Sequence, residues 1–143
     1  MKNRMAELEK LTGDVGSFLE EHAVPSAAAL TAALALEEII TNIVKYGYDD
    51  NSEHVIAVSL ELQPERLVLQ VSDDGHAFDP LSAPAPDTKQ PLEERRIGGL
   101  GLHLVRQMAE AVEYRRVANR NIQEVRISLA SPCKAARPNE GCT

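Results

Sequence analysis

The hydrophobic and polar positions of this chain follow two different periods, one helical and one extended. In the first 45 residues, apolar side chains recur every three or four positions, which predicts amphipathic helices over residues 3–22 and 27–45. Residues 53–62 and 65–73 instead alternate apolar and polar side chains and are rich in β-branched residues. This alternation predicts two antiparallel strands joined by a short turn.

The second half of the chain begins with a segment that has no period. Residues 78–97 contain four prolines, which is typical of a long lid or a disordered segment. Four residues, 98–101, then open a third helix, whose apolar stripe runs from Leu102 to Val112. Residues 111–119 and 121–129 alternate again and predict a closing hairpin.

This order of elements predicts an α+β fold, a two-layer sandwich with helices on one face of a mixed, mostly antiparallel sheet. At 143 residues the chain has the size of one domain that can bury its own core. We expect that domain over residues 1–130, with a lid at about 78–97 and a disordered tail at 131–143.

Composition argues against several classes of partner. A formal net charge of -7 and an aromatic content of 3% do not suit a protein that binds nucleic acid. No apolar run approaches the roughly 18 residues of a membrane span, and the N-terminus has no signal-like apolar segment. We therefore expect a cytoplasmic protein without membrane contact.

Cys133 and Cys142 have neither a zinc-site spacing nor a nearby histidine.

A row of polar side chains accompanies the apolar stripe of the second predicted helix. That stripe consists of Leu36, Ile39, Ile40, Ile43 and Val44. Glu38, Asn42 and Tyr46 follow at intervals of four, so the carboxylate and the carboxamide lie one turn apart. An amide oxygen suits Mg²⁺, and a carboxylate nearby can take a proton from an attacking hydroxyl or water. The helix alone favours the ordinary alternative, in which the pair is solvated or makes a side-chain contact.

A second candidate site lies at the end of the strand over residues 65–73. Leu69, Val71 and Asp73 share one side of that strand, so Asp73 faces the core and needs a hydrogen-bond donor. The exocyclic amine of adenine is one such donor, and Gly75 would let the chain turn closely over the base. The simple alternative is an Asp-Gly turn that ends the strand.

A third candidate site is the glycine-rich start of the third helix, where free N–H groups and the helix dipole favour phosphate. Its residues are Gly98, Gly99, Leu100, Gly101 and Leu102. The spacing matches neither the dinucleotide fingerprint nor a P-loop, and a packing or hinge role explains the glycines equally well. Arg96 could reach a terminal phosphate from the lid, although a solvated charge run explains it as well.

Taken together, the three sites occur in the order that a nucleotide pocket requires. They resemble the N, G1 and G2 boxes of the ATP-binding superfamily that includes gyrase, heat-shock chaperones, histidine kinases and MutL. More narrowly, LEEIITNIVKYGY, VSDDGHAFDP and GGLGLHLVRQMAEAVEYRR resemble the small anti-sigma factor serine/threonine kinases. The resemblance covers roughly residues 8–129 and implies the Bergerat ATP-binding fold.

The resemblance also implies a role for each site. Glu38 matches the family's catalytic base, Asn42 its Mg²⁺ ligand and Asp73 its adenine-binding carboxylate. Further nucleotide contacts are expected at Gly75, Arg96, Gly98, Gly99, Leu100, Gly101 and Leu102. The implied activity is Mg²⁺-ATP-dependent phosphorylation of a Ser or Thr on a small antagonist protein, by a homodimer that also binds a sigma factor. An ATP-responsive interaction module without kinase activity and an ATPase acting on water remain alternatives.

Three features depart from the family pattern. Ala77 and Phe78 replace a second glycine of the G1 box. Tyr46 stands where many relatives have histidine. Few residues precede the first predicted helix, which leaves little room for the family's usual first strand.

Overall fold

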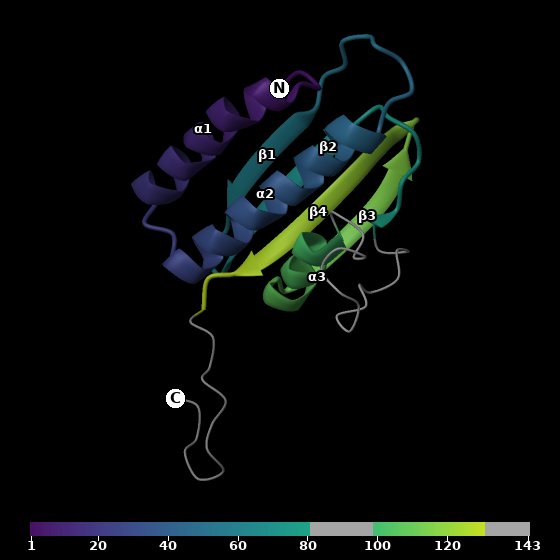
Figure 1. The fold of residues 1–143 in the computed structure, drawn as a ribbon. Helices are drawn as coiled ribbons and strands as arrows, with labels where there is room; N and C mark the ends of the chain where they lie inside the picture. The colour runs from purple at the N-terminus through teal and green to yellow at the C-terminus, as the bar shows by residue number, and fades with distance from the viewer. Residues whose placement is uncertain (81–98, 131–143) are drawn as a thin grey trace, which may run out of the picture.

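The computed structural model describes residues 1–80 and 99–130 (Figure 1). In chain order its elements are the 3-10 turn η1 (Met5–Glu7), the helices α1 (Leu8–Glu21) and α2 (Ser26–Tyr46), the strands β1 (Ala57–Leu62) and β2 (Arg66–Asp73), the helix α3 (Gly99–Met108), and the strands β3 (Ala111–Val117) and β4 (Arg120–Ser128). Most of the expected lid lies outside the described residues, as does the expected tail with both cysteines.

The four strands form one open sheet in the order β1-β2-β4-β3, and the three helices cover one of its faces (Figure 1). Every pairing between these strands is antiparallel. The expected two-layer α+β sandwich is therefore confirmed, and its described part is wholly antiparallel rather than mixed.

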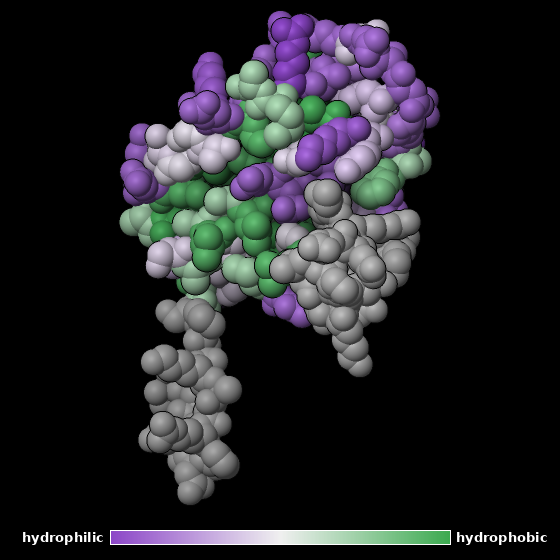
Figure 2. All heavy atoms as spheres, in the orientation of Figure 1, coloured by the Kyte–Doolittle hydropathy of each residue, from purple (hydrophilic) through white to green (hydrophobic). Residues whose placement is uncertain are grey.

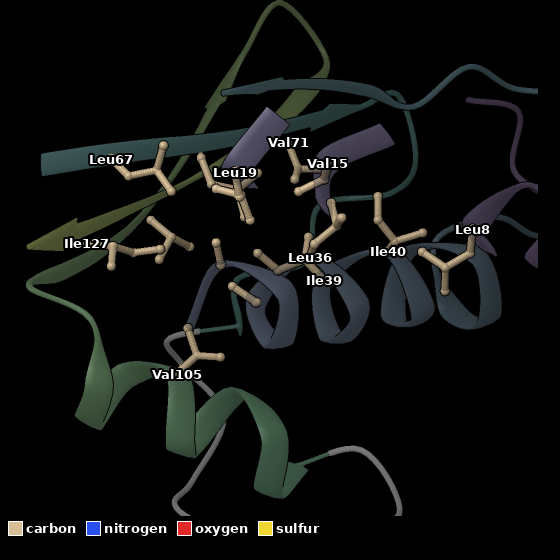
Figure 3. Packing of buried hydrophobic residues seen from close by; sticks show 14 of the residues in the cluster. Leu8, Val15, Leu19, Leu36, Ile39, Ile40, Leu67, Val71, Val105 and Ile127 are labelled. Carbon is tan, nitrogen blue, oxygen red and sulfur yellow. The ribbon is translucent and has the colours of Figure 1, made fainter. Parts of the chain in front are cut away.

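The core lies between the helical layer and the inner face of the sheet. From α2, Leu36 and Ile40 point toward Leu67 and Val71 of β2, and Val105 reaches the cluster from α3 (Figure 3). These five side chains are at most 1% exposed. Their burial fixes the rotation of α2 and α3 about their axes, and with it the direction of the polar residues beside them.

The helix α2 is also long and apolar enough, by length and composition alone, to cross a membrane, which the sequence-based expectation missed. In this fold 44% of its apolar window is buried. The exposed remainder includes Leu30, which is 62% exposed. Hydrophobic residues reach the surface at the lower left of the coloured part of Figure 2, where the N-terminal half of α2 lies in Figure 1. Packing on the sheet therefore accounts for only part of the apolar character of α2.

Three element boundaries differ clearly from the predicted ones. The first helix was expected from residue 3, whereas α1 begins at Leu8, after the 3-10 turn η1. The strand β1 begins at Ala57 because the residues before it pair with the N-terminus, where Lys2 and Val55 form an antiparallel bridge. The helix α3 ends at Met108, so Val112 belongs to β3 and not to a helical stripe. A short apolar run fits both periods, and pairing with β4 decides the outcome here.

Candidate functional site

The helix α2 presents its polar row beside the buried stripe, as its periodicity predicts. Ile39 and Ile43 are buried, Glu38 and Asn42 are half-buried on the flank, and Glu37 is exposed. The half-buried pair is thus neither in the core nor fully solvated. Asn42 faces a pocket at the C-terminal end of α2.

Glu38 lies against the start of α3. A Cβ at Gly101 would overlap the Glu38 carboxyl group, so with any other residue at this position the Glu38 side chain would have to move. Burial, helped by the negative charge of Glu37 and opposed by Lys45, raises the pKa of Glu38 above that of an ordinary glutamate. The carboxyl group is therefore a better proton acceptor than a solvated one, once it is ionised.

Asp73 is the last residue of β2 and is only 1% exposed. Its Oδ1 accepts a hydrogen bond from the backbone N–H of Gly75 (2.9 Å) and another from Nδ2 of Asn121 (3.0 Å). These bonds hold the carboxylate in one orientation at the edge of the pocket. Its Oδ2 takes part in no hydrogen bond with the residues that the structure describes, and so can accept one from a ligand.

Asn121 is the centre of a network that the sequence analysis missed. Besides Asp73, its Nδ2 donates to the carbonyl of His76 (2.8 Å). Its Oδ1 accepts from the hydroxyl of Tyr114 (2.7 Å) and from the guanidinium of Arg116 (2.8 Å). The carboxamide is therefore fully engaged, and its orientation is set by two donors on β3.

A sequence signal for this network existed in the alternation of β4. The inward positions of that strand end in Val125 and Ile127, but they begin with Asn121 and Gln123, which are 3% and 4% exposed. Two amides at core positions call for partners. Arg116 also donates to the carbonyl of Gly75 in the loop after β2 (3.1 Å).

Gly75 is required for space. A Cβ at this position would lie 2.5 Å from the carbonyl oxygen of Gly47 and 2.8 Å from Oδ1 of Asp73. The same Gly47 carbonyl accepts the backbone N–H of His76 (3.0 Å). The close approach that glycine allows here is thus to the end of α2, in addition to any approach to a base.

The loop between α2 and β1 is attached to the same region. The ring of Tyr48 stacks on His54, with centroids 4.1 Å apart. The two ring nitrogens of His54 lie 2.8 Å from Asp50 and 3.2 Å from Asp74, and these hydrogen bonds raise the pKa of His54. Burial, together with the charges of Asp73 and Asp74, raises the pKa of Tyr48 as well. The loop therefore contributes aromatic and charged groups directly behind the carboxylate of Asp73.

These elements surround a small pocket that is open to solvent. Its lining residues are Asn42, Ile43, Tyr46, Gly47, Asp73, His76, Phe78, Asn121 and Gln123. Apolar and aromatic side chains supply flat surfaces, and a few polar groups converge on them, as in sites for planar ligands. A purine base fits this chemistry.

The remaining predicted nucleotide contacts lie in α3 or just before it, and none of those that the structure describes lines the pocket. Gly99 begins α3, Leu100 is 42% exposed, and the side chain of Leu102 is buried, so any ligand contact at Leu102 would use its backbone. Arg96 and Gly98 lie outside the described residues. The structure therefore joins Asn42 to Asp73 through one pocket and Glu38 to Gly101 through a direct contact. The roles of all these residues remain predictions.

The antiparallel sheet with one helical layer defines a two-layer α+β domain, with a pocket at the end of α2 and a glycine-rich helix start packed against Glu38. The chain belongs to the histidine kinase-like ATPase domain family, whose model matches residues 1–129. This match confirms the resemblance seen in the sequence. A solved histidine kinase domain, from the blue-light activated histidine kinase of Erythrobacter litoralis EL346, has the same fold, with a TM-score of 0.55 at 18% identity over 87% of this chain and 60% of that one.

Curated relatives are named as serine kinases. The serine/threonine-protein kinase BtrW of Bordetella bronchiseptica is 30% identical over 60% of this chain and 61% of its own length. The serine-protein kinase RsbW of Listeria monocytogenes is 32% identical over 56% of this chain and 54% of its own length. The chain thus spans between half and two thirds of these relatives.

Proposed function

We propose that this chain is a Mg²⁺- and ATP-dependent protein serine/threonine kinase of the cytoplasm. In this proposal it phosphorylates a small antagonist protein and, in a second complex, binds a sigma factor. The observation that carries the proposal is the placement of three groups along and beyond the C-terminal half of α2. Glu38 contacts the start of α3, Asn42 follows one turn later in the pocket, and Asp73 lies at the pocket's edge.

Each group supports one part of a phosphoryl transfer. Asp73 accepts a hydrogen bond from the amine of the base, and the glycine-rich start of α3 provides N–H groups for the phosphates. The serine oxygen of the partner forms the new bond to the γ-phosphorus while the bond to the leaving oxygen of ADP breaks. The serine proton passes to Glu38, whose raised pKa suits a general base.

The residues present fit a magnesium ion held mainly by its substrate. Among the described residues no three His, Cys, Asp or Glu side chains cluster as a metal site. At the pocket, Asn42 offers a neutral amide oxygen on the same flank of α2 as Glu38. Mg²⁺ commonly takes one or two protein ligands and completes its shell with phosphate oxygens and water, so Asn42 suffices as the protein ligand. The bound ion would neutralise charge on the phosphates during transfer.

Support for the partners comes from the family resemblance and from the relatives named as serine kinases. The net charge of -7 also disfavours direct contact with nucleic acid. A regulator with this charge would act on transcription through proteins. A homodimer is part of the same proposal.

The first test is calorimetry of ATP binding with Mg²⁺ and with chelator, for the wild type and Asn42→Ala. Binding that needs both the ion and Asn42 supports the metal assignment. Transfer is then assayed with γ-labelled ATP and small proteins from the source cell, for the wild type and Glu38→Ala. A labelled serine that disappears in Glu38→Ala is expected. Phosphate release without a labelled protein would favour an ATPase, and ATP binding without either product would favour an interaction module.

A further inference from the structure

Two carboxamides on β4 lie next to each other on the inner face of the sheet, yet they differ in their bonding. Asn121 and Gln123 are both almost completely buried. Asn121 is opposite Asp73 in the β2–β4 pairing and uses its carboxamide to hold that carboxylate. Gln123 is opposite Val71, one inward position further from the strand end.

The side chain of Gln123 lines the pocket and takes part in no hydrogen bond with the residues that the structure describes. Its 4% exposure is inward, toward the pocket. Among the described residues, the hydroxyl of Tyr48 is the one completely enclosed side-chain polar atom without a hydrogen-bond partner, so the amide of Gln123 still reaches solvent through the pocket. A polar group in this state at a pocket wall points to a ligand as its partner.

Asp73 alone does not define the base. Its Oδ2 is free to accept from an exocyclic amine, but guanine and cytosine carry such amines as well as adenine. In adenine the ring nitrogen N1, next to the amine, is a hydrogen-bond acceptor and needs a donor. On neighbouring antiparallel strands, diagonal residues of one face lie within side-chain reach, and Gln123 is the diagonal neighbour of Asp73.

We propose that Gln123 is a specificity-determining residue that donates its amide N–H to N1 of adenine, while Oδ2 of Asp73 accepts from the N6 amine. This assignment rests on the proposed function, in which the pocket takes the base of ATP. The pair forms an acceptor and a donor side by side, which matches the amine and N1 of a 6-aminopurine. Asn121 is the positioning residue, because it acts on the base only through Asp73.

The test compares three nucleotides that differ by one group: ATP, 1-deaza-ATP, which lacks the N1 acceptor, and purine riboside triphosphate, which lacks the amine. Binding is measured by calorimetry for the wild type and for Gln123→Met, which keeps the volume and removes the donor. The matched control is Gln70→Met, at a β2 position on the outer face of the sheet. Thermal unfolding of each variant checks that it folds.

The wild type is expected to bind ATP about tenfold more tightly than 1-deaza-ATP, as one hydrogen bond allows. Gln123→Met should bind ATP about tenfold more weakly than the wild type does, and purine riboside triphosphate should lose affinity by the same factor. The affinity of Gln123→Met for 1-deaza-ATP should equal that of the wild type. In this variant, ATP and 1-deaza-ATP should therefore bind equally well. Gln70→Met should leave all three affinities unchanged.

Equal losses for ATP and 1-deaza-ATP in Gln123→Met would overturn the contact with N1, while leaving the ATP site intact. If Gln123→Met does not fold, the wild type alone decides, because equal binding of ATP and 1-deaza-ATP also overturns it. Failure of the wild type to bind any of the three nucleotides refutes the proposed function and the inference together.

Discussion

Replacing Gly75 by alanine tests whether the loop after β2 is packed as the structure describes. The new Cβ would lie 2.5 Å from the Gly47 carbonyl oxygen and 2.8 Å from Oδ1 of Asp73, whereas ordinary contacts begin at 3.4 Å. Neither neighbour can move freely. The Gly47 carbonyl is bonded to the backbone of His76, and Oδ1 of Asp73 accepts two hydrogen bonds. The backbone itself must therefore shift by several tenths of an ångström.

Such overpacking costs about 1–3 kcal/mol. For a domain of this size, that loss lowers the melting temperature by roughly 4–12 °C. Because Asp73 moves with the loop, affinity for ATP should fall in the same variant. The measurements are urea and thermal unfolding followed by circular dichroism, and calorimetry of ATP binding.

Gly13→Ala is the matched control, because the same substitution should raise the stability of the fold at that position. Gly13 lies inside α1, and a Cβ at this position would have no atom within 4 Å. Alanine in a helix interior is more favourable than glycine by about 0.5–1 kcal/mol, so this variant should be more stable than the wild type. If Gly75→Ala is as stable as the wild type, the packing of this loop on the end of α2 is refuted.

Three further predictions concern the other end of the site and the loop behind it. Gly101→Ala should displace the Glu38 carboxylate and reduce the rate of phosphoryl transfer about 100-fold. The affinity for ATP, measured by calorimetry, should change less than the rate of labelled transfer. Equal losses of affinity and of transfer rate would contradict this prediction. The rate of transfer should fall as pH drops through the raised pKa of Glu38. Glu37→Gln should move this fall in rate to lower pH, and Lys45→Gln should move it to higher pH. A pH–rate profile that neither substitution moves would refute the role of Glu38 as general base. Because the pKa of His54 is raised, its contribution to stability is complete below its unfolded-state pKa and is lost as pH rises through its folded-state pKa. His54→Gln should therefore flatten the curve of melting temperature against pH between these two pKa values.

The fold was largely predictable because its elements have clear periods. The helix α2 and the strands β2 and β4 lie within two residues of their predicted bounds. Errors occurred where local pattern does not decide. The start of β1 depends on pairing with the N-terminus, and the end of α3 depends on pairing with β4, and both of these pairings are long-range.

The candidate site was predictable where one element suffices. Helical spacing predicted that Glu38 and Asn42 would lie on one flank, and strand alternation predicted that Asp73 would face inward. The contact between Glu38 and Gly101 was not predictable in the same way, because it depends on how closely α3 approaches α2. Glycine at that position was read as a phosphate contact, whereas the missing side chain also makes room for the carboxylate.

The polar end of the sheet depends on the register between β2 and β4. Along the inner face of β2, apolar residues lead to Asp73 at the strand end, and along β4 the polar pair Asn121 and Gln123 comes first. Antiparallel pairing brings these polar ends together and pairs the apolar ends with each other. A slip of one residue would turn Ile122 and Glu124 inward and expose Val125, which is completely buried. The register that buries the core is therefore the same register that assembles the base pocket, so a change that weakens one should weaken the other.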